Sequence, residues 1–300
     1  MSEAVDEFVR GRSLWQDAMG RLRRNRLAFW GGLYVGLLLL ACGIVPLLVD
    51  PLQQRTAAPF QRPSLHANPG TGAVHLFGTD ELGRDLFARV FYGGRISFLI
   101  AIVATAVSVL IGTFYGSIAG YAGGRADNLM MRFVDVLYGL PYMFIVILVL
   151  VVWGRGLVPI FVALGCFQWL TTARIVRGQV ISYKHREFVD AARTIGASDR
   201  RILFRHLLPN VIGPVIIYTT LTVPAVILLE SFLSFLGLGV QEPFTSWGLL
   251  AAEGTRAVNP LASYRFILFW PAFFLGSTLL ALNFLGDGLR DAIDPKGRRT

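Results

Sequence analysis

The sequence predicts an all-α, polytopic membrane protein with six transmembrane helices. Apolar residues make up 54% of its 300 residues and charged residues only 16%, whereas charged residues approach a quarter of an average soluble domain. The mean hydropathy of +0.57 points the same way. Six stretches are apolar over about 20 residues, the length that a helix needs to cross a hydrocarbon core of roughly 30 Å. They are continuously apolar instead of alternating at period two, which favours helices over a β-barrel.

The predicted spans follow one another in chain order with four longer polar segments between and after them. The spans cover residues 27–49, 96–122, 136–154, 157–173, 211–236 and 266–286. The polar segments are the loops 50–95, 174–210 and 237–265 and the tail 287–300.

Residues 1–26 precede the first span and are predicted to form a helix on the membrane surface. Leu14, Ala18 and Leu22 fall on one face of such a helix, and arginines gather elsewhere on it. We do not expect a cleavable signal peptide, because the apolar run that follows is too long for one.

The distribution of lysine and arginine predicts the orientation, because these residues are retained on the cytoplasmic side of the membrane. Twenty of the 28 fall on the side that holds both termini and the loop 174–210, and eight fall on the other side. Both termini and this loop are therefore expected in the cytoplasm, and 50–95 and 237–265 outside. The net charge of +9 fits arginines beside anionic membrane lipid, so no nucleic-acid partner is expected.

The sequence carries no signature of catalysis. Cys42 and Cys166 fall inside predicted spans, and the four histidines are not spaced as metal ligands. The motifs HExxH and GxSxG are absent, and so is a phosphate loop, since Lys184 and Lys296 are the only lysines. We expect a protein that is not an enzyme, has no metal or cofactor of its own and does not itself hydrolyse ATP.

The most informative stretch is the charged island over 187–210, between the fourth and fifth spans. Good helix formers fill 187–195. Within it, Ala191 and Ala192 present little bulk, so another protein can approach the backbone closely. This segment is predicted to dock onto a cytoplasmic partner.

The same island is predicted to contain two short helices at an angle. Gly196 is suited to end the first helix at positive φ, and Ser198 with Asp199 to cap and begin the second. A DNA-binding helix-turn-helix has a similar outline. Here, however, spans tether the segment at both ends, which favours docking to a protein.

At these residues the chain resembles the bacterial ABC importer permeases. Their coupling loop carries the pattern EAA, three residues, Gly, nine residues and Ile-x-Leu-Pro. Here it stands as Asp190-Ala191-Ala192, Gly196 and His206-Leu207-Leu208-Pro209. Asp190 replaces the leading Glu, and His206 occupies the Ile position, with Leu207 as an apolar substitute.

Other segments are similar to the peptide importers, the group that includes oligopeptide, dipeptide and nickel permeases. The stretch FGTDELGRD at 77–85 looks like their GTDxxGRD element, and SFLSFLGLG at 231–239 and DGLRDAIDP at 287–295 are similar to theirs as well. The likeness covers about 22–296, with a core permease region over about 94–290, and fits best the second permease subunit.

The resemblance implies a type I ABC importer fold in a bacterial inner membrane. It also implies a heterodimer with a homologous permease, two cytoplasmic ATPases that bind the ATP, and an external solute-binding protein. The residues expected to couple to the ATPases are Glu187, Asp190, Ala191, Ala192, Arg193, Gly196, Leu208 and Pro209.

The same resemblance suggests di- or oligopeptides as the cargo, with nickel chelates, glutathione and peptide-like antibiotics left open. Two other classes of protein fit less well. A membrane-embedded enzyme would place catalytic His, Asp or Lys inside the spans. A stand-alone secondary transporter would carry its own coupling residues or inverted repeats.

Two features inside the spans have competing interpretations. Gly112, Gly116 and Gly120 recur every four residues, which favours close helix packing over contact with the cargo. Glu230 is the only charged residue within a predicted span. It either borders the translocation pathway or pairs with a neighbouring helix.

The outer loop 50–95 ends in a compact charged cluster formed by Asp80, Glu81, Arg84 and Asp85. Two interpretations stand side by side: a docking site for the binding protein, or an internal ion-paired cap over the second span. In the other outer loop, 237–265, Pro243 and Trp247 suggest an interfacial or re-entrant helix.

Overall fold

The computed structural model describes residues 20–51, 58–67, 72, 74–258 and 264–293. Over these residues the chain is helical and forms no β-strand, and an isolated bridge joins Thr79 and Asp85. This confirms the predicted all-α class. The predicted surface helix over 1–26 lies mostly outside the described residues.

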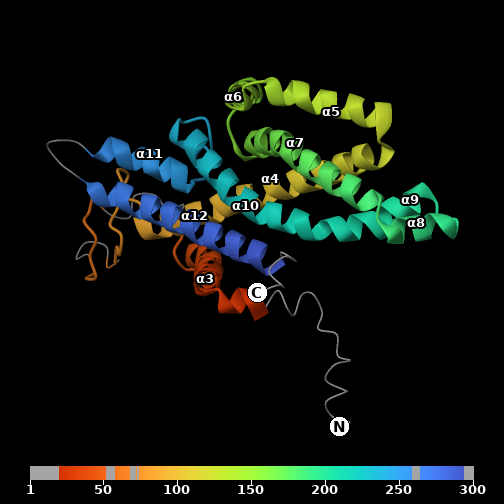
Figure 1. Ribbon diagram of the computed structural model, residues 1–300. Helices are drawn as coiled ribbons and strands as arrows, with labels where there is room; N and C mark the ends of the chain where they lie inside the picture. Colours follow the sequence, from red (N-terminus) through yellow and green to blue (C-terminus); the bar gives the residue numbers. More distant parts are fainter. Residues whose placement is uncertain (1–19, 52–57, 68–71, 73, 259–263, 294–300) are drawn as a thin grey trace, which may run out of the picture.

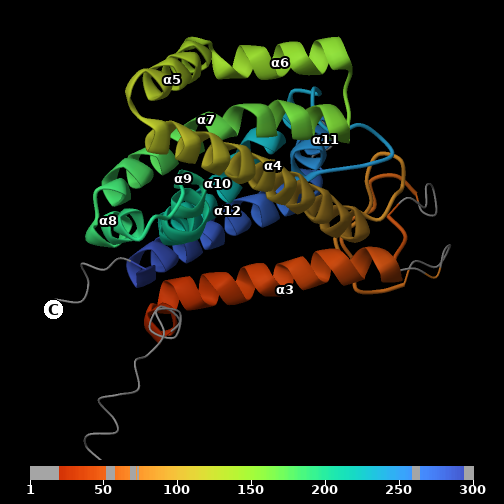
Figure 2. The ribbon, with the colours of Figure 1, turned by 90° about the vertical axis from the view of Figure 1, so that its right-hand side faces the viewer.

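Five of the described helices are long and apolar enough to cross a membrane. Helices α4 and α7 lie side by side along most of their length, and α3 packs against α12 below them (Figure 2). The five are α3 (Arg26–Leu48), α4 (Leu86–Ala122), α7 (Leu157–Lys184), α10 (Leu208–Phe235) and α12 (Arg265–Ile293).

A sixth span arises when two consecutive helices are counted as one. Helices α5 (Gly124–Gly139) and α6 (Tyr142–Trp153) meet at an angle of 80°. The pair lies along the edge of the bundle beside α7 (Figures 1 and 2). The break falls at Leu140, which precedes Pro141 and has an extended backbone, with φ −79° and ψ 140°. A proline pushes the residue before it out of the helical region. The straight span expected over 136–154 is therefore corrected to a bent pair that starts at Gly124.

Several helices extend past the apolar runs that predicted them. Helix α4 starts at Leu86, ten residues before the predicted span, because the Asp85 side chain accepts a hydrogen bond from the backbone N–H of Ala88 at 2.8 Å. Helix α7 continues to Lys184, eleven residues beyond the expected end at 173. Polar residues end an apolar run without ending a helix, so these segments of the predicted loops are helical.

Helix α11 (Trp247–Ala257) fills much of the predicted outer loop 237–265 and packs beside α10 and α12 (Figure 1). Trp247 is fully buried, and its indole Nε1 donates a hydrogen bond to the carbonyl of Val90 on α4 at 2.9 Å. Ser246 caps the helix by accepting from the N–H of Leu249. These contacts fix α11 against the start of α4.

Candidate functional site

The charged island over 187–210 lies at the end of the bundle opposite α11 (Figure 1). Helix α8 (Glu187–Thr194) follows α7 after a short turn. The second helix expected in this island is not separate. It begins as α9 (Asp199–Arg201), continues through the π-helical turn η1 (Ile202–Leu207) and becomes α10, so that Asp199–Phe235 forms one continuous helix of 37 residues.

The π-helical turn follows from Pro209. A proline has no N–H to donate, and in a regular α-helix its ring would press on the carbonyl of the residue four positions earlier, Arg205. The chain widens the preceding turn, and the N–H of Leu208 bonds to the carbonyl of Leu203, five residues back. The Leu-Pro pair of the sequence motif thus sits where the docking segment joins the spanning helix.

Helix α8 packs onto this junction through one face. Val189 and Ala192, three residues apart, are buried in a cluster with residues of α7 and η1, including Val180 and Ile202. The expectation that Ala192 lies on the docking surface is therefore corrected. Its small side chain allows α8 to approach the protein's own core, and only Ala191 faces outward.

The outward face of α8 carries an apolar stripe. Phe188, Ala191 and Ile195 follow one another at helical spacing and are exposed, Ile195 to 85%. Ile195 was missed by the sequence analysis, although its spacing from Ala191 would have placed it on this face. Single exposed apolar residues are ordinary, whereas several on one face of a helix form the kind of patch that protein contacts use.

Polar groups flank this apolar stripe. Glu187, Asp190 and Arg193 are exposed, and a weak ion pair of 3.4 Å joins Arg193 to Asp190. On the neighbouring helix start, a shallow surface hollow of about 380 Å³ is lined by Ser198, Arg200, Arg201 and Phe204. The apolar stripe beside this basic hollow suits a partner protein whose surface carries both apolar and charged groups.

Gly196 ends α8 as predicted from its conformational freedom. Its φ is +81°, in the left-handed region. The N–H of Gly196 bonds to the carbonyl of Arg193 at 2.9 Å, and that of Ala197 to Ala192 at 3.0 Å, which together form a Schellman cap. No atom lies within 4 Å of where a side chain would begin, so the backbone alone requires glycine here.

The end of α4 holds this docking segment from the other side. The hydroxyl of Tyr121 donates to the carboxylate of Asp199 at 2.5 Å. The ammonium of Lys184 in turn donates to the carbonyl of Tyr121. The start of the α9–α10 helix and the end of α7 are therefore both tied to one residue.

The glycines of α4 face α7. A Cβ atom added at Gly112 would come within 2.5 Å of the Cβ of Thr172, and one at Gly120 within 2.9 Å of the carbonyl oxygen of Arg177. At Gly116 it would collide with the carbonyl oxygen of Ala173. The three glycines bring the two backbones together within this chain, as the packing interpretation expects.

Glu230 is completely buried in the contact between α4 and α10. Its carboxylate accepts hydrogen bonds from Ser97 at 3.0 Å, from Ser234 at 2.7 Å and, more weakly, from Ser231 at 3.4 Å. The Ser97 hydroxyl also accepts from the N–H of Trp247. Glu230 thus joins α4, α10 and α11 through hydroxyl groups, and in this conformation it lies away from any surface that could border a pathway.

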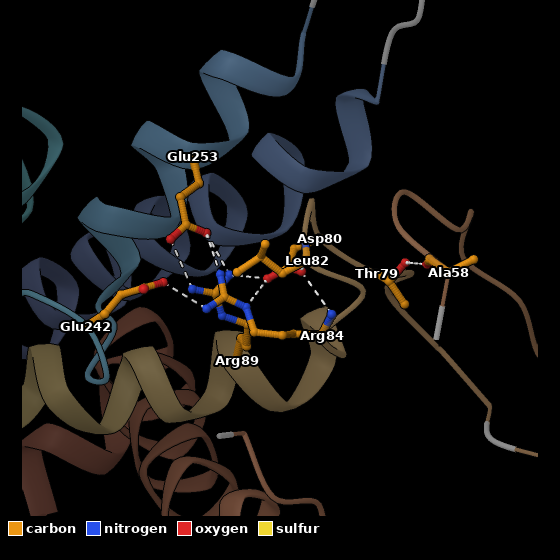
Figure 3. A network of polar contacts seen from close by, with 8 residues as sticks. All are labelled: Ala58, Thr79, Asp80, Leu82, Arg84, Arg89, Glu242 and Glu253. Atoms are coloured by element: carbon orange, nitrogen blue, oxygen red, sulfur yellow. Dashed lines mark hydrogen bonds and ion pairs between the residues drawn. The ribbon is translucent and has the colours of Figure 1, made fainter. Parts of the chain in front are cut away.

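The outer charged cluster is built around Asp80, which is only 2% exposed (Figure 3). One carboxylate oxygen accepts from Arg84 Nε at 2.6 Å and from Arg89 at 2.5 Å, and the other accepts from the backbone N–H groups of Leu82 and Arg84 at 2.9 Å each. All of the acceptor capacity of Asp80 is therefore used inside the protein.

The two arginines extend this cluster to distant parts of the chain. Arg89 forms a bidentate pair with Glu253 on α11, at 2.6 and 3.0 Å, and Arg84 bonds to Glu242 at 2.8 Å (Figure 3). Burial lowers the pKa of Arg84, but hydrogen bonds to Glu242 and Asp80 outweigh it and raise that pKa above its usual value. Through these bonds the two arginines fasten α11 and the segment before it to the start of α4.

This geometry matches the internal ion-paired cap that the sequence left open beside a docking role. Asp80 and Arg84 are buried, and Asp85 uses one oxygen to cap α4 and the other to bind His75 at 2.7 Å. Glu81 alone of the four predicted residues has an exposed side chain. A docking role for this cluster is therefore limited to Glu81 and the loop around it.

We expect Asp80→Asn to destabilise the protein strongly, by about 3–5 kcal/mol, because it leaves two buried arginines without their shared carboxylate. The measurement is thermal unfolding of the purified complex in detergent. Glu81→Gln, one residue away and exposed, is the matched control and should leave the unfolding temperature unchanged. Equal effects of the two substitutions would contradict the cap.

Comparisons with known proteins identify the family of this chain. Residues 112–299 match the family of binding-protein-dependent transport system inner membrane components, and residues 13–63 match the N-terminal transmembrane domain of oligopeptide transport permease C. The chain is 49% identical over 288 residues to the dipeptide transport system permease protein DppC of Bacillus subtilis, covering 96% of this chain and 87% of that protein.

Two further relatives extend the comparison. The oligopeptide transport system permease protein OppC of Haemophilus influenzae is 47% identical and covers 99% of this chain and 94% of its own length. The glutathione transport system permease protein GsiD of Pectobacterium atrosepticum is 36% identical and covers 95% and 92%. With a family match over most of its length and relatives that align almost end to end, this chain belongs to the binding-protein-dependent transport system inner membrane components.

Proposed function

We propose that this chain is one of two permease subunits in an ATP-driven importer of di- or oligopeptides. The observation that carries the proposal is the identity of 49% and 47% to dipeptide and oligopeptide permeases along nearly the whole chain. The chain is the non-catalytic subunit, and ATP is bound and hydrolysed by partner subunits. It needs no cofactor of its own.

The proposed complex has five proteins in a bacterial inner membrane. A homologous permease supplies the other half of the pathway, two ABC ATPases dock from the cytoplasm, and a solute-binding protein delivers the cargo from outside. The termini and the α8 end of the bundle face the cytoplasm in this proposal. The excess of lysine and arginine on that side supports the orientation.

Coupling is proposed to run through α8. The stripe of Phe188, Ala191 and Ile195 contacts an ATPase, and the buried face of α8 transmits the movement of that ATPase to α7 and η1. Because the α9–α10 helix is continuous, a displacement at Asp199 reaches the middle of the membrane without crossing a loop. The Schellman cap at Gly196 keeps α8 at a fixed angle to this helix.

Glutathione is the second candidate cargo, because relatives named as glutathione permeases align with 95% of this chain. Their identity, 36% and 37%, is lower than that of the peptide permeases. Glutathione is itself a tripeptide with one unusual linkage, so the two candidates share most of their chemistry. The binding protein is where they are expected to diverge.

The test is uptake by the complete complex reconstituted in proteoliposomes with the binding protein encoded beside this chain. We expect uptake of labelled di- and tripeptides that requires both ATP and the binding protein, and weaker uptake of glutathione. Copurification of two ATPases with the permease is expected as well. Uptake without ATP, or a permease that purifies without ATPases, would indicate a stand-alone transporter and contradict the proposal.

A further inference from the structure

The exposed face of the inner half of α7 differs from a face that contacts lipid. Over residues 171–184 the exposed positions are Arg174, Gly178 and Ser182, spaced four residues apart along one side of the helix. On α6, by contrast, the exposed side chains are large and apolar, such as Phe144 at 73% and Leu148 at 59%. The face of α6 suits lipid, whereas the stripe on α7 suits water.

Arg174 is the first charged residue after the apolar run that ends at residue 173. It is ten residues before the end of α7 at Lys184, or about 15 Å along the helix. Its guanidinium pairs with Asp135 of α5 at 2.8 Å, and the two side chains are 40% and 59% exposed. Charged groups next to an apolar run are costly in contact with lipid, so they face water or protein.

A second ion pair between the same helices is bidentate and less exposed. Arg177 and Asp127 form two hydrogen bonds, at 2.6 and 2.7 Å, and the side chain of Asp127 is only 9% exposed. Arg174 makes one hydrogen bond to Asp135, and the described residues give it no second carboxylate. The Arg177–Asp127 pair holds the helices together. In the Arg174–Asp135 pair, both side chains keep hydrogen-bonding groups that the pair does not use.

Aromatic and hydroxyl groups surround this open pair. The ring of Tyr138 lies under the guanidinium of Arg174, 4.1 Å from its central carbon, and its hydroxyl lies 3.1 Å from that of Thr171. One turn further along the stripe, Gly178 has no atom within 4 Å of a Cβ position. The guanidinium is thus stacked on a ring, and its side chain stays 40% exposed.

We propose that Asp135, Tyr138, Thr171 and Arg174 form a cargo subsite in the cytoplasmic half of the translocation pathway, with Gly178 and Ser182 continuing it toward the cytoplasm. This inference rests on the proposed peptide import. A free peptide carries an α-carboxylate and an α-ammonium group. Arg174 binds the carboxylate of the peptide through its unused donors, and Asp135 binds the ammonium group. The peptide then lies between the two side chains and takes the place of the ion pair between them.

The first test asks whether the stripe meets water. Thr171→Cys and Gly178→Cys are made in a chain with Cys166→Ser, in the full complex, and inside-out vesicles are treated with a charged, membrane-impermeant thiol reagent with and without ATP. Both cysteines should react in at least one condition, while Leu148→Cys, the matched control on α6, should not. Protection of both cysteines throughout would mean that lipid or the partner permease covers this face and would overturn the proposal.

The second test asks what the subsite binds. Dialanine added from the cytoplasmic side should slow labelling of Gly178→Cys, and its C-terminal amide should need a concentration about tenfold higher, which corresponds to one lost charge-assisted contact. Adding Arg174→Gln should abolish that difference. Labelling without protection by either peptide would overturn the subsite, whereas failure of the wild-type complex to take up peptides would overturn the proposed function instead.

Discussion

Replacing Gly116 with leucine is expected to prevent formation of the folded permease. A Cβ atom at this position would already collide with the carbonyl oxygen of Ala173, and the obstacle is helix backbone, which cannot rotate away as a side chain would. Helices α4 and α7 would have to separate along their contact, at a cost of about 3 kcal/mol or more. The measurement is the amount of permease that elutes as a monodisperse complex after solubilisation.

The control for Gly116 is another glycine inside a helix, but one with no atom close to its Cβ position. Gly36 on α3 has no atom within 4 Å of a Cβ position and is exposed. Gly36→Ala should leave the yield unchanged, since alanine favours a helix over glycine. If Gly116→Leu assembles as well as this control, the two backbones are not as close as the structure places them.

Gly196→Asp is expected to abolish ATP-driven uptake while the permease still inserts and folds. The position is exposed and spacious, so the folded chain accommodates the side chain with only the cost of a left-handed backbone, about 1 kcal/mol. The new carboxylate, however, would stand next to Ile195 on the proposed docking surface. Burying an unpaired charge against an ATPase costs several kcal/mol, which is enough to uncouple the complex.

Gly237 provides a control with the same backbone. It ends α10 with φ +76°, its Cβ position is also empty, and the N–H groups of Gly237 and Leu238 form the same pair of capping bonds. It lies at the opposite end of the bundle. Gly237→Asp should therefore keep its ATPases bound during purification, and Gly196→Asp should lose them. Loss of ATPases from both variants would point to backbone strain instead of docking.

The sequence predicted the class of the fold well and the ends of its helices poorly. Apolar runs identify what lies in a membrane, but a cap or a proline decides where a helix starts and stops. Asp85 extends α4 outward, and Pro141 breaks the expected third span. Helix α5 was largely missed because its first twelve residues are amphipathic and carry charges that a search for apolar runs rejects.

The parts of the site that depend on neighbouring residues in the sequence could be predicted. The parts that depend on residues far away in the sequence could not. Gly196 required only a helix end, which the residues around it indicate. The cap around Asp80 depends on Glu242 and Glu253, more than 150 residues away, and no local pattern reveals such a partner. The burial of Ala192 depends on which face α8 turns inward, which is set by Val189 and the core beneath it.

The prolines of α10 have a consequence for how the protein can flex. Pro209, Pro214 and Pro224 each remove one backbone hydrogen bond from the α9–α10 helix, and all three lie between Asp199 and Glu230. Tyr121 anchors one end of this interval and the serine hydroxyls around Glu230 anchor the other. A displacement imposed at the α8 end therefore meets the least resistance between these anchors. The middle of α10 is therefore the part of the helix that bends most easily, and the curvature of the helix should concentrate there.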